Sequence, residues 1–147
     1  MLDQVEENRV LVVAASLDNL DRIRSFIAET ASELGADSSS ISDLQLAVDE
    51  AVTNIVMHGY RNSTGEVEVE LTCEADIIIV RIRDNAPVFD LSDTAVPDLN
   101  TSPLEKDTPG GYGVFLIQHM VDMAENQILD DGRNELILHK RKVSAGK

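Results

Sequence analysis

Two polar residues four positions apart, Glu50 and Asn54, are the first candidates for chemistry in this sequence. Residues at this spacing share one face of a helix. A carboxylate beside a neutral amide oxygen suits Mg²⁺, a hard cation that keeps most of its waters. The carboxylate can instead serve as a general base toward a hydroxyl or a water. A solvent-facing polar stripe on an amphipathic helix has the same spacing, so the pair alone does not decide between these explanations.

Two later segments add to this pair. Asp84 directly follows an apolar run, where a carboxylate can accept a hydrogen bond from an exocyclic amine, although the sequence Asp-Asn-Ala-Pro also suits a plain turn. The glycines of the segment 110–113 precede a helical pattern, and such a turn lets backbone N–H groups approach a phosphate. A flexible hinge has the same composition. The segment is not a P-loop, because no Lys-Ser or Lys-Thr follows the glycines, and no strand runs straight into it as in a dinucleotide fingerprint.

Helical spacing predicts the elements that position these residues. A first helix begins after Ser16 and ends at Gly35, and a second begins at Ser40 with Asp43 in the style of a capping box and ends at Gly59. The second helix carries Glu50 and Asn54. Its wide apolar stripe indicates deep burial and consists of Leu44, Ala47, Val48, Ala51, Val52, Ile55 and Val56.

The remaining pattern predicts strands, a long loop and a third helix. Residues 9–15 form an apolar run typical of a buried strand, and 66–83 alternate as an antiparallel hairpin with its glutamates facing outward. A proline-interrupted loop at 84–109 is of a length that is usually functional or disordered. A third helix is expected from a helical spacing of apolar residues, namely Val114, Ile117, Met120, Val121 and Ala124. A turn at Asp131-Gly132 then leads to a last strand at 135–141.

This order favours a single α+β domain over residues 1–147. Helices are too few for a doubly wound parallel sheet, so we expect a two-layer sandwich with a mixed, mostly antiparallel sheet and helices on one face.

Composition limits the function further. The net charge is −15, which argues against binding nucleic acid or an anionic membrane through a basic face. The single cysteine allows no intramolecular disulfide, and no apolar run reaches the roughly 20 residues of a membrane span. We therefore expect a cytoplasmic protein.

The three segments, in this order, resemble the ATP site shared by gyrase, histidine kinases and the MutL repair proteins. Within that superfamily, LQLAVDEAVTNIVMHGY (44–60) resembles the first motif of the anti-sigma-factor serine/threonine kinases, and RDNAPVFD (83–90) and GGYGVFLIQHMVD (110–122) resemble the second and third. The resemblance extends over about residues 8–142 and implies the histidine-kinase-like ATPase fold.

The resemblance also implies a role for each matched residue. Asn54 would coordinate the Mg²⁺ that bridges the phosphates of ATP, Glu50 would be the general base toward the acceptor serine, and Asp84 would hold the adenine amine. Residues 91–109 would form a lid. The remaining nucleotide-binding residues would be Ala86, Lys106, Gly110, Gly111, Tyr112, Gly113 and Val114. Lys106 is included as a phosphate contact because it is the only Lys or Arg between Arg83 and Arg133.

The function implied is that of a Mg-ATP-dependent serine/threonine protein kinase. Its substrate would be an anti-anti-sigma protein, a sigma factor would compete for it, and it would form a homodimer through the sheet with the N-terminal strand as the edge. The alternatives are a regulator that binds nucleotide and a partner without phosphorylating it, and a degenerate domain that binds no nucleotide. A histidine kinase is disfavoured, because no dimerisation helices are expected upstream and the histidines fall inside the domain at positions 58, 119 and 139.

Overall fold

Alternating glutamate and apolar residues build the centre of the sheet. The computed structural model describes residues 9–61, 63–87 and 117–143. β2 (Glu66–Glu74) and β3 (Ile77–Asp84) form an antiparallel hairpin, as predicted, with a turn in which Ala75 has a φ of 55°. Val67, Val69 and Leu71 are fully buried, because one face of the hairpin packs against the helices.

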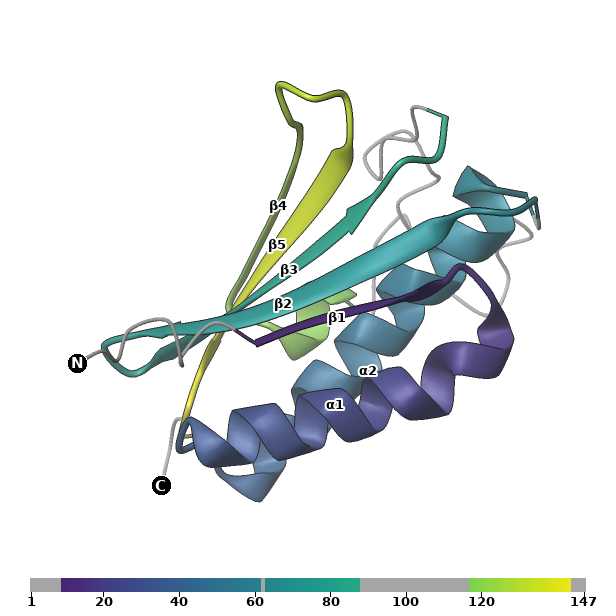
Figure 1. The fold of residues 1–147 in the computed structure, drawn as a ribbon. Coiled ribbons are helices and arrows are strands. Elements are labelled where there is room, and N and C mark those ends of the chain that lie inside the picture. Colours follow the sequence, from purple (N-terminus) through teal and green to yellow (C-terminus); the bar gives the residue numbers. More distant parts are fainter. Residues whose placement is uncertain (1–8, 62, 88–116, 144–147) are drawn as a thin grey trace, which may run out of the picture.

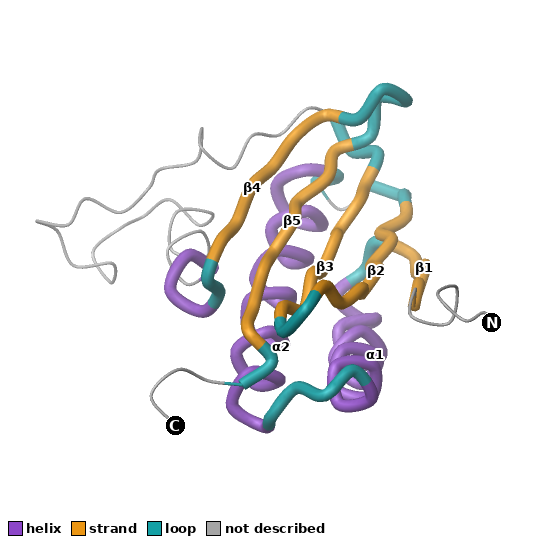
Figure 2. The backbone as a smooth tube through the Cα atoms, turned by 90° about the vertical axis from the view of Figure 1, so that its left-hand side faces the viewer, coloured by secondary structure: helices purple, strands orange, loops and turns teal. Residues whose placement is uncertain are grey.

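The described strands form one antiparallel sheet in the order β1-β2-β3-β5-β4, in which every neighbouring pair is antiparallel. α1 and α2 lie side by side on one face of this sheet and leave the other face open (Figure 1), and the five strands run across the helices in this order (Figure 2). This is the predicted two-layer α+β architecture. The outer elements are β1 (Arg9–Ala14), β4 (Met123–Ile128), β5 (Asn134–Arg141), α1 (Leu20–Glu33) and α2 (Ser38–Asn54).

The core lies between the helices and the sheet. Ile23 and Ile27 of α1 and Leu44 of α2 are almost fully buried, and they meet Ile78 and Leu138 of the sheet in one cluster. The predicted apolar stripe of α2 is buried along its whole length, so this helix is held rigidly against β2, β3 and β5.

The starts of the two helices differ in how well the sequence predicted them. Ser16 caps as expected, since its Oγ accepts a hydrogen bond from the Asp18 N–H at 3.1 Å, but it does so on a short 3₁₀ turn at Leu17–Asn19 that leads into α1. The expected start of α2 at Ser40 was wrong. Asp37 is the N-cap and accepts from the Ser40 N–H at 2.8 Å, because an aspartate one residue before the serines reaches the free N–H groups of the first turn.

Two predictions at the sheet edges were also wrong. The N-terminal strand is buried on one face only: Val13 is 5% exposed, but Val10 and Val12 are 50% and 46% exposed, because no helix among the described residues covers their face of β1. The third helix does not reach Ala124. Residues 117–120 are helical, but β4 begins at Met123 and pairs with β5 in a hairpin closed by the predicted Asp131-Gly132 turn.

No helix in the described ranges is long and apolar enough to cross a membrane.

Candidate functional site

Asn54 is the last residue of α2 and is only 4% exposed. Its Nδ2 atom is buried and finds no hydrogen-bond partner among the described residues. A buried amide left unpaired costs free energy unless something outside the described chain satisfies it. Glu50 lies one turn earlier on the same helix and is half-buried. The structure therefore presents the predicted pair together, with Asn54 deeper than Glu50.

A π turn follows Asn54 directly and shapes the end of the helix. It spans Ile55–Gly59, and the Tyr60 N–H donates to the Ile55 carbonyl at 2.8 Å. Such turns occur often at functional sites. At Gly59, an added Cβ would lie 3.1 Å from the Cβ of Ala86, so the glycine permits close contact with the loop after β3. The end of α2 and the Asp84 loop are thus neighbours.

Asp84 ends β3 and is 7% exposed, on the face of the sheet that the helices cover. Its Oδ1 accepts hydrogen bonds from the Ala86 N–H and from the Asn134 Nδ2, each at 2.9 Å. Burial raises the pKa of the Asp84 carboxyl, while the hydrogen bonds from Asn134 and Ala86 oppose that rise. Both of these hydrogen bonds go to Oδ1. The other carboxylate oxygen, Oδ2, is therefore the one suited to accept a hydrogen bond from a donor outside the described residues.

Asn134 is a site residue that the sequence did not reveal. It is the first residue of β5 and pairs directly with Asp84 in the sheet register. Its Nδ2 also donates to the Ala86 carbonyl at 3.2 Å, so one amide group holds both the carboxylate and the loop behind it. The only sequence signal was its position just before the strand predicted at 135–141, and pairing across 50 residues cannot be read from that.

Glu50 lies in a charged environment shared with α1. The Arg24 Nε donates to Asp49 Oδ2 at 2.7 Å and thereby ties α1 to the residue beside Glu50. Burial raises the pKa of the Glu50 carboxyl, and the neighbouring Asp49 charge raises it further. A carboxylate with a raised pKa is a better proton acceptor than an ordinary surface glutamate.

The chemistry of Asn54 fits Mg²⁺ when phosphates supply further oxygens. A single amide oxygen, together with waters and phosphate oxygens, is a normal magnesium environment. The described residues contain no group of three or more His, Cys, Asp or Glu side chains able to hold a metal by themselves. The unpaired atom of Asn54 is the donor Nδ2, which suits an acceptor such as a phosphate oxygen, whereas Oδ1 is the atom of this side chain that could face Mg²⁺.

The remaining residues predicted to contact the nucleotide fall into two groups, one within the described residues and one outside them. Ala86 is buried beside Asp84 and Gly59, and its contact with nucleotide stays a prediction. The glycine turn and the lid lie outside the described residues, and so do Lys106, Gly110, Gly111, Tyr112, Gly113 and Val114. The described part of the candidate site therefore consists of the end of α2 and the Asp84 loop.

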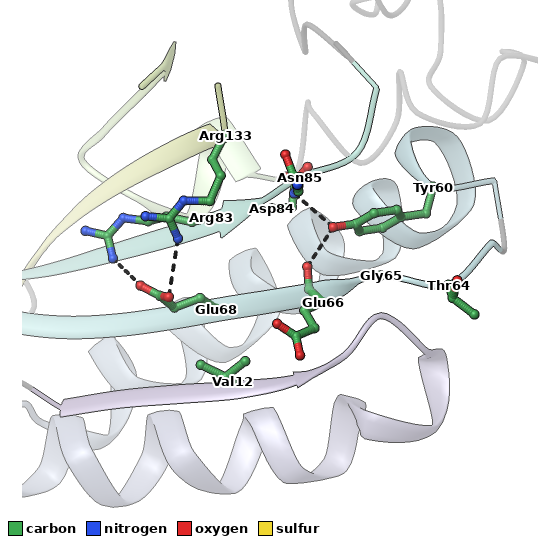
Figure 3. A pocket seen from close by; sticks show the side chains of 10 residues that line it. All are labelled: Val12, Tyr60, Thr64, Gly65, Glu66, Glu68, Arg83, Asp84, Asn85 and Arg133. Atoms are coloured by element: carbon green, nitrogen blue, oxygen red, sulfur yellow. Dashed lines mark hydrogen bonds and ion pairs between the residues drawn. The ribbon is translucent and has the colours of Figure 1, made fainter. Parts of the chain in front are cut away.

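A separate pocket of about 400 Å³ lies on the open face of the sheet, at the end where Asp84 is found. Figure 3 shows the Tyr60 ring and the Asn85 backbone at one side of it and the guanidinium groups of Arg83 and Arg133 at the other. Arg83 is committed to an ion-pair network, with contacts of 2.8 Å to both Glu70 and Glu135. The other lining residues are Val12, Thr64, Gly65, Glu66, Glu68 and Asp84.

Comparison with known proteins agrees with this geometry. The sequence pattern of the histidine kinase-like ATPase domain matches residues 13–140, which is most of the chain. The chain belongs to this family. Within it, the chain groups with proteins named serine-protein kinase RsbW, which are about a third identical to it.

Three comparisons give the scale of the likeness. The serine-protein kinase RsbW of Oceanobacillus iheyensis is 36% identical over 100 residues, which are 65% of this chain and 63% of that protein. The serine-protein kinase RsbW of Bacillus licheniformis is 33% identical over 72% of this chain and 69% of its own. The crystal structure of the RsbU and RsbW domains of a Mycobacterium tuberculosis protein matches 90% of this chain and 32% of that chain, with a TM-score of 0.61 at 22% identity, and so supports the fold.

Proposed function

We propose that this histidine kinase-like ATPase domain is a Mg-ATP-dependent serine/threonine protein kinase that phosphorylates an anti-anti-sigma-type protein and also binds a sigma factor. The observation that carries the proposal is the pairing on α2 of the half-buried Glu50 with the buried Asn54, whose Nδ2 has no hydrogen-bond partner among the described residues, at the end of the helix that contacts the Asp84 loop.

The nucleotide would bind between this helix end and the loop. Asp84 would accept a hydrogen bond from the adenine amine, because its carboxylate is buried and fixed by Asn134 and by the Ala86 N–H. Asn54 would present its amide oxygen to Mg²⁺. When bound, that ion would neutralise negative charge on the phosphate oxygens. Lys106, the segment 110–113 and Val114 are proposed as the remaining phosphate-side contacts.

Glu50 is the residue that distinguishes the proposed kinase from a protein that only binds nucleotide. In the proposed reaction its carboxylate takes the proton of the acceptor hydroxyl while that oxygen forms its bond to the γ-phosphorus and ADP leaves. The raised pKa of its carboxyl suits this role, provided that it is ionised at the working pH. Binding of Mg-ATP by itself would need Asn54 and Asp84 but not this carboxylate.

Phosphorylation would act as a switch for the partner. A phosphate adds about −2 charges at neutral pH, and in a packed interface with a protein of net charge −15 it repels. The phosphorylated partner would therefore leave, and the sigma factor would take its place.

The test is transfer of labelled γ-phosphate from ATP to a purified anti-anti-sigma-type protein. Glu50→Gln should lower the rate of transfer by on the order of 10²–10⁴ while leaving ATP affinity nearly unchanged, because only the proton acceptor is lost. Glu29→Gln is the matched control, since Glu29 is an exposed residue of α1 and its loss should change neither quantity.

Each result separates the alternatives. Tight ATP binding by the wild type with no transfer to any such partner would favour the regulator that only holds its partner. Absence of a calorimetric signal with Mg-ATP would contradict both functions and would indicate a domain that binds no nucleotide.

A further inference from the structure

Tyr60 occupies the joint between the end of α2 and the Asp84 loop. It is the first residue after the π turn and is 6% exposed. Its hydroxyl donates a hydrogen bond to the Glu66 carbonyl and accepts one from the Asn85 N–H, both at 2.8 Å. Figure 3 shows the ring reaching from the helix end across to both backbones. One side chain therefore links three segments: the helix end, the start of β2 and the loop after β3.

The ring is fixed on its own side as well. An added Cβ at Gly65 would lie 2.2 Å from the Tyr60 Cε1 atom, so the ring occupies the space that any other residue at position 65 would fill. The backbone at Gly65 is held in turn, because its carbonyl accepts from the Ala15 N–H at 2.8 Å. A side chain seated this closely has little rotamer freedom, and its hydroxyl lies at a fixed point.

The loop that the hydroxyl reaches is the one that carries the proposed adenine contact. Asn85 immediately follows Asp84, and the next residue, Ala86, is held by Asn134 on the β5 side and by Gly59 on the helix side. Without the Tyr60 hydroxyl, the Asn85 N–H would have no acceptor on the helix side. The loop that carries Asp84 would then lose its hydrogen bond to the helix end and keep those from Asn134 and the Ala86 N–H to the Asp84 carboxylate.

We propose that Tyr60 is a positioning residue for adenine recognition: its hydroxyl holds the Asn85 backbone and so sets the place of the Asp84 carboxylate relative to the end of α2. This inference rests on the proposed nucleotide site. Tyr60 itself does not touch the reacting atoms, and its effect passes through the loop. The expected cost of losing the hydroxyl is that of one net hydrogen bond, which corresponds to roughly a fivefold loss of affinity.

The test compares the wild type with Tyr60→Phe, which keeps the ring and removes only the hydroxyl. The first measurement is amide hydrogen exchange at Asn85 without nucleotide, which should become at least several-fold faster in the variant. The second is the affinity for ATP and for GTP. The preference for ATP should fall about fivefold, because GTP has no exocyclic amine at the position that Asp84 would recognise.

A purely structural role for Tyr60 would lower stability but leave the ATP preference unchanged. The matched control is Gln45→Met, which removes a hydrogen bond of 3.0 Å from α2 to the Arg24 carbonyl, away from the loop. It should leave both the Asn85 exchange and the nucleotide preference as in the wild type.

The outcomes are distinguishable. Unchanged exchange at Asn85 would overturn the link between the hydroxyl and the loop. Faster exchange with an unchanged preference for ATP would overturn the positioning role while the proposed kinase function stands. A wild type that binds no ATP would overturn that function and the adenine role together, and the exchange measurement would still decide whether the link to the loop exists.

Discussion

At the scale of single residues, the buried carboxylate of Asp84 connects the proposed site with stability. Its folded-state pKa is raised above the ordinary value of 3.8, with burial as the main cause. The favourable contribution to folding is therefore fully present below about pH 4, where the group is protonated in both states. It is lost as the pH rises through the folded-state pKa, because the folded protein must then bury a charge. At neutral pH Asp84 costs stability, as expected of a residue kept for binding.

We therefore expect Asp84→Asn to be more stable than the wild type at about pH 7, by roughly 1 kcal/mol. The asparagine oxygen can still accept from Ala86 and Asn134, while the buried charge is gone. The advantage should shrink as the pH falls toward 4. Urea unfolding of both proteins across this range measures it, and calorimetry should show that ATP binding is lost in the variant.

Asp131→Asn is the control with the opposite sign. Hydrogen bonds from the Arg133 backbone and side chain lower the pKa of this fully exposed carboxyl. The ionised Asp131 carboxylate therefore contributes to folding stability above its ordinary pKa, and this contribution is lost as the pH falls through the lowered pKa of the folded protein. The variant should accordingly be no more stable than the wild type at neutral pH. A wild type more stable than Asp84→Asn at pH 7 would mean that the greater strength of the two hydrogen bonds to a charged carboxylate outweighs the cost of burying that charge.

At the scale of elements, the sequence predicted those helices and strands whose own residues show a clear apolar pattern. The apolar stripe of α2 and the alternation of β2 determined the framework that carries Glu50 and Asn54, and the structure confirms both. β4 was missed, because all its residues are exposed and none alternate, so Ala124 read as one more helical position. The chain leaves the helix there since the Asp122 N–H donates to the His139 carbonyl of β5, a contact that sequence spacing does not show.

The same difference between local patterns and long-range contacts explains which site residues the sequence revealed. Glu50 and Asn54 are near in sequence and were found together. The contact of Asp84 with Asn134, like that of Tyr60 with Asn85, joins distant segments and appears only once the strands are paired. The role of Lys106 and of the glycine turn stays a prediction.

Lys140 is one of the residues that tie the short helix at 117–120 to the rest of the fold. Its ammonium group donates to Asp43 Oδ2 on α2 and to the Met120 carbonyl, each at 2.9 Å, and its side chain is 13% exposed. A cation at a carbonyl near a helix C-terminus is favourable. The contact therefore links this short helix to α2, the helix that carries Glu50.

We expect Lys140→Met to lower the free energy of unfolding by about 1–2 kcal/mol, since it removes a charge-assisted hydrogen bond and leaves the Met120 carbonyl unpaired. Lys140→Arg should restore part of the loss. Arg141→Met is the matched control, because Arg141 is exposed on the same strand and its loss should fall within about 0.5 kcal/mol of the wild type. Equal effects of the Lys140→Met and Arg141→Met changes on urea unfolding would contradict this assignment.

At the scale of the whole molecule, the net charge opposes association of two copies of the chain, while the exposed edge of the sheet favours it. A net charge of −15 repels a second copy of the chain. The edge strand β1 has a neighbour only on the β2 side of the described sheet, and it exposes Val10 and Val12. An unpaired edge of this kind can pair with another strand. The predicted homodimer through β1 therefore depends on whether the apolar edge overcomes the repulsion, and salt should favour it by screening the charge.

The expected outcome is a dimer that strengthens between about 0.05 and 0.5 M salt, measured by sedimentation equilibrium. Val10→Glu should weaken it by roughly tenfold or more, because it brings two like charges together at the paired edges, whereas Val10→Thr should leave it largely intact. Ile128→Glu places the same charge at the opposite edge, on a residue 58% exposed, and should have little effect. If the Ile128 change disrupts the dimer as strongly, β4 is the interface; a wild type that stays monomeric at every salt concentration would mean that repulsion prevails and that the site works within one copy of the chain.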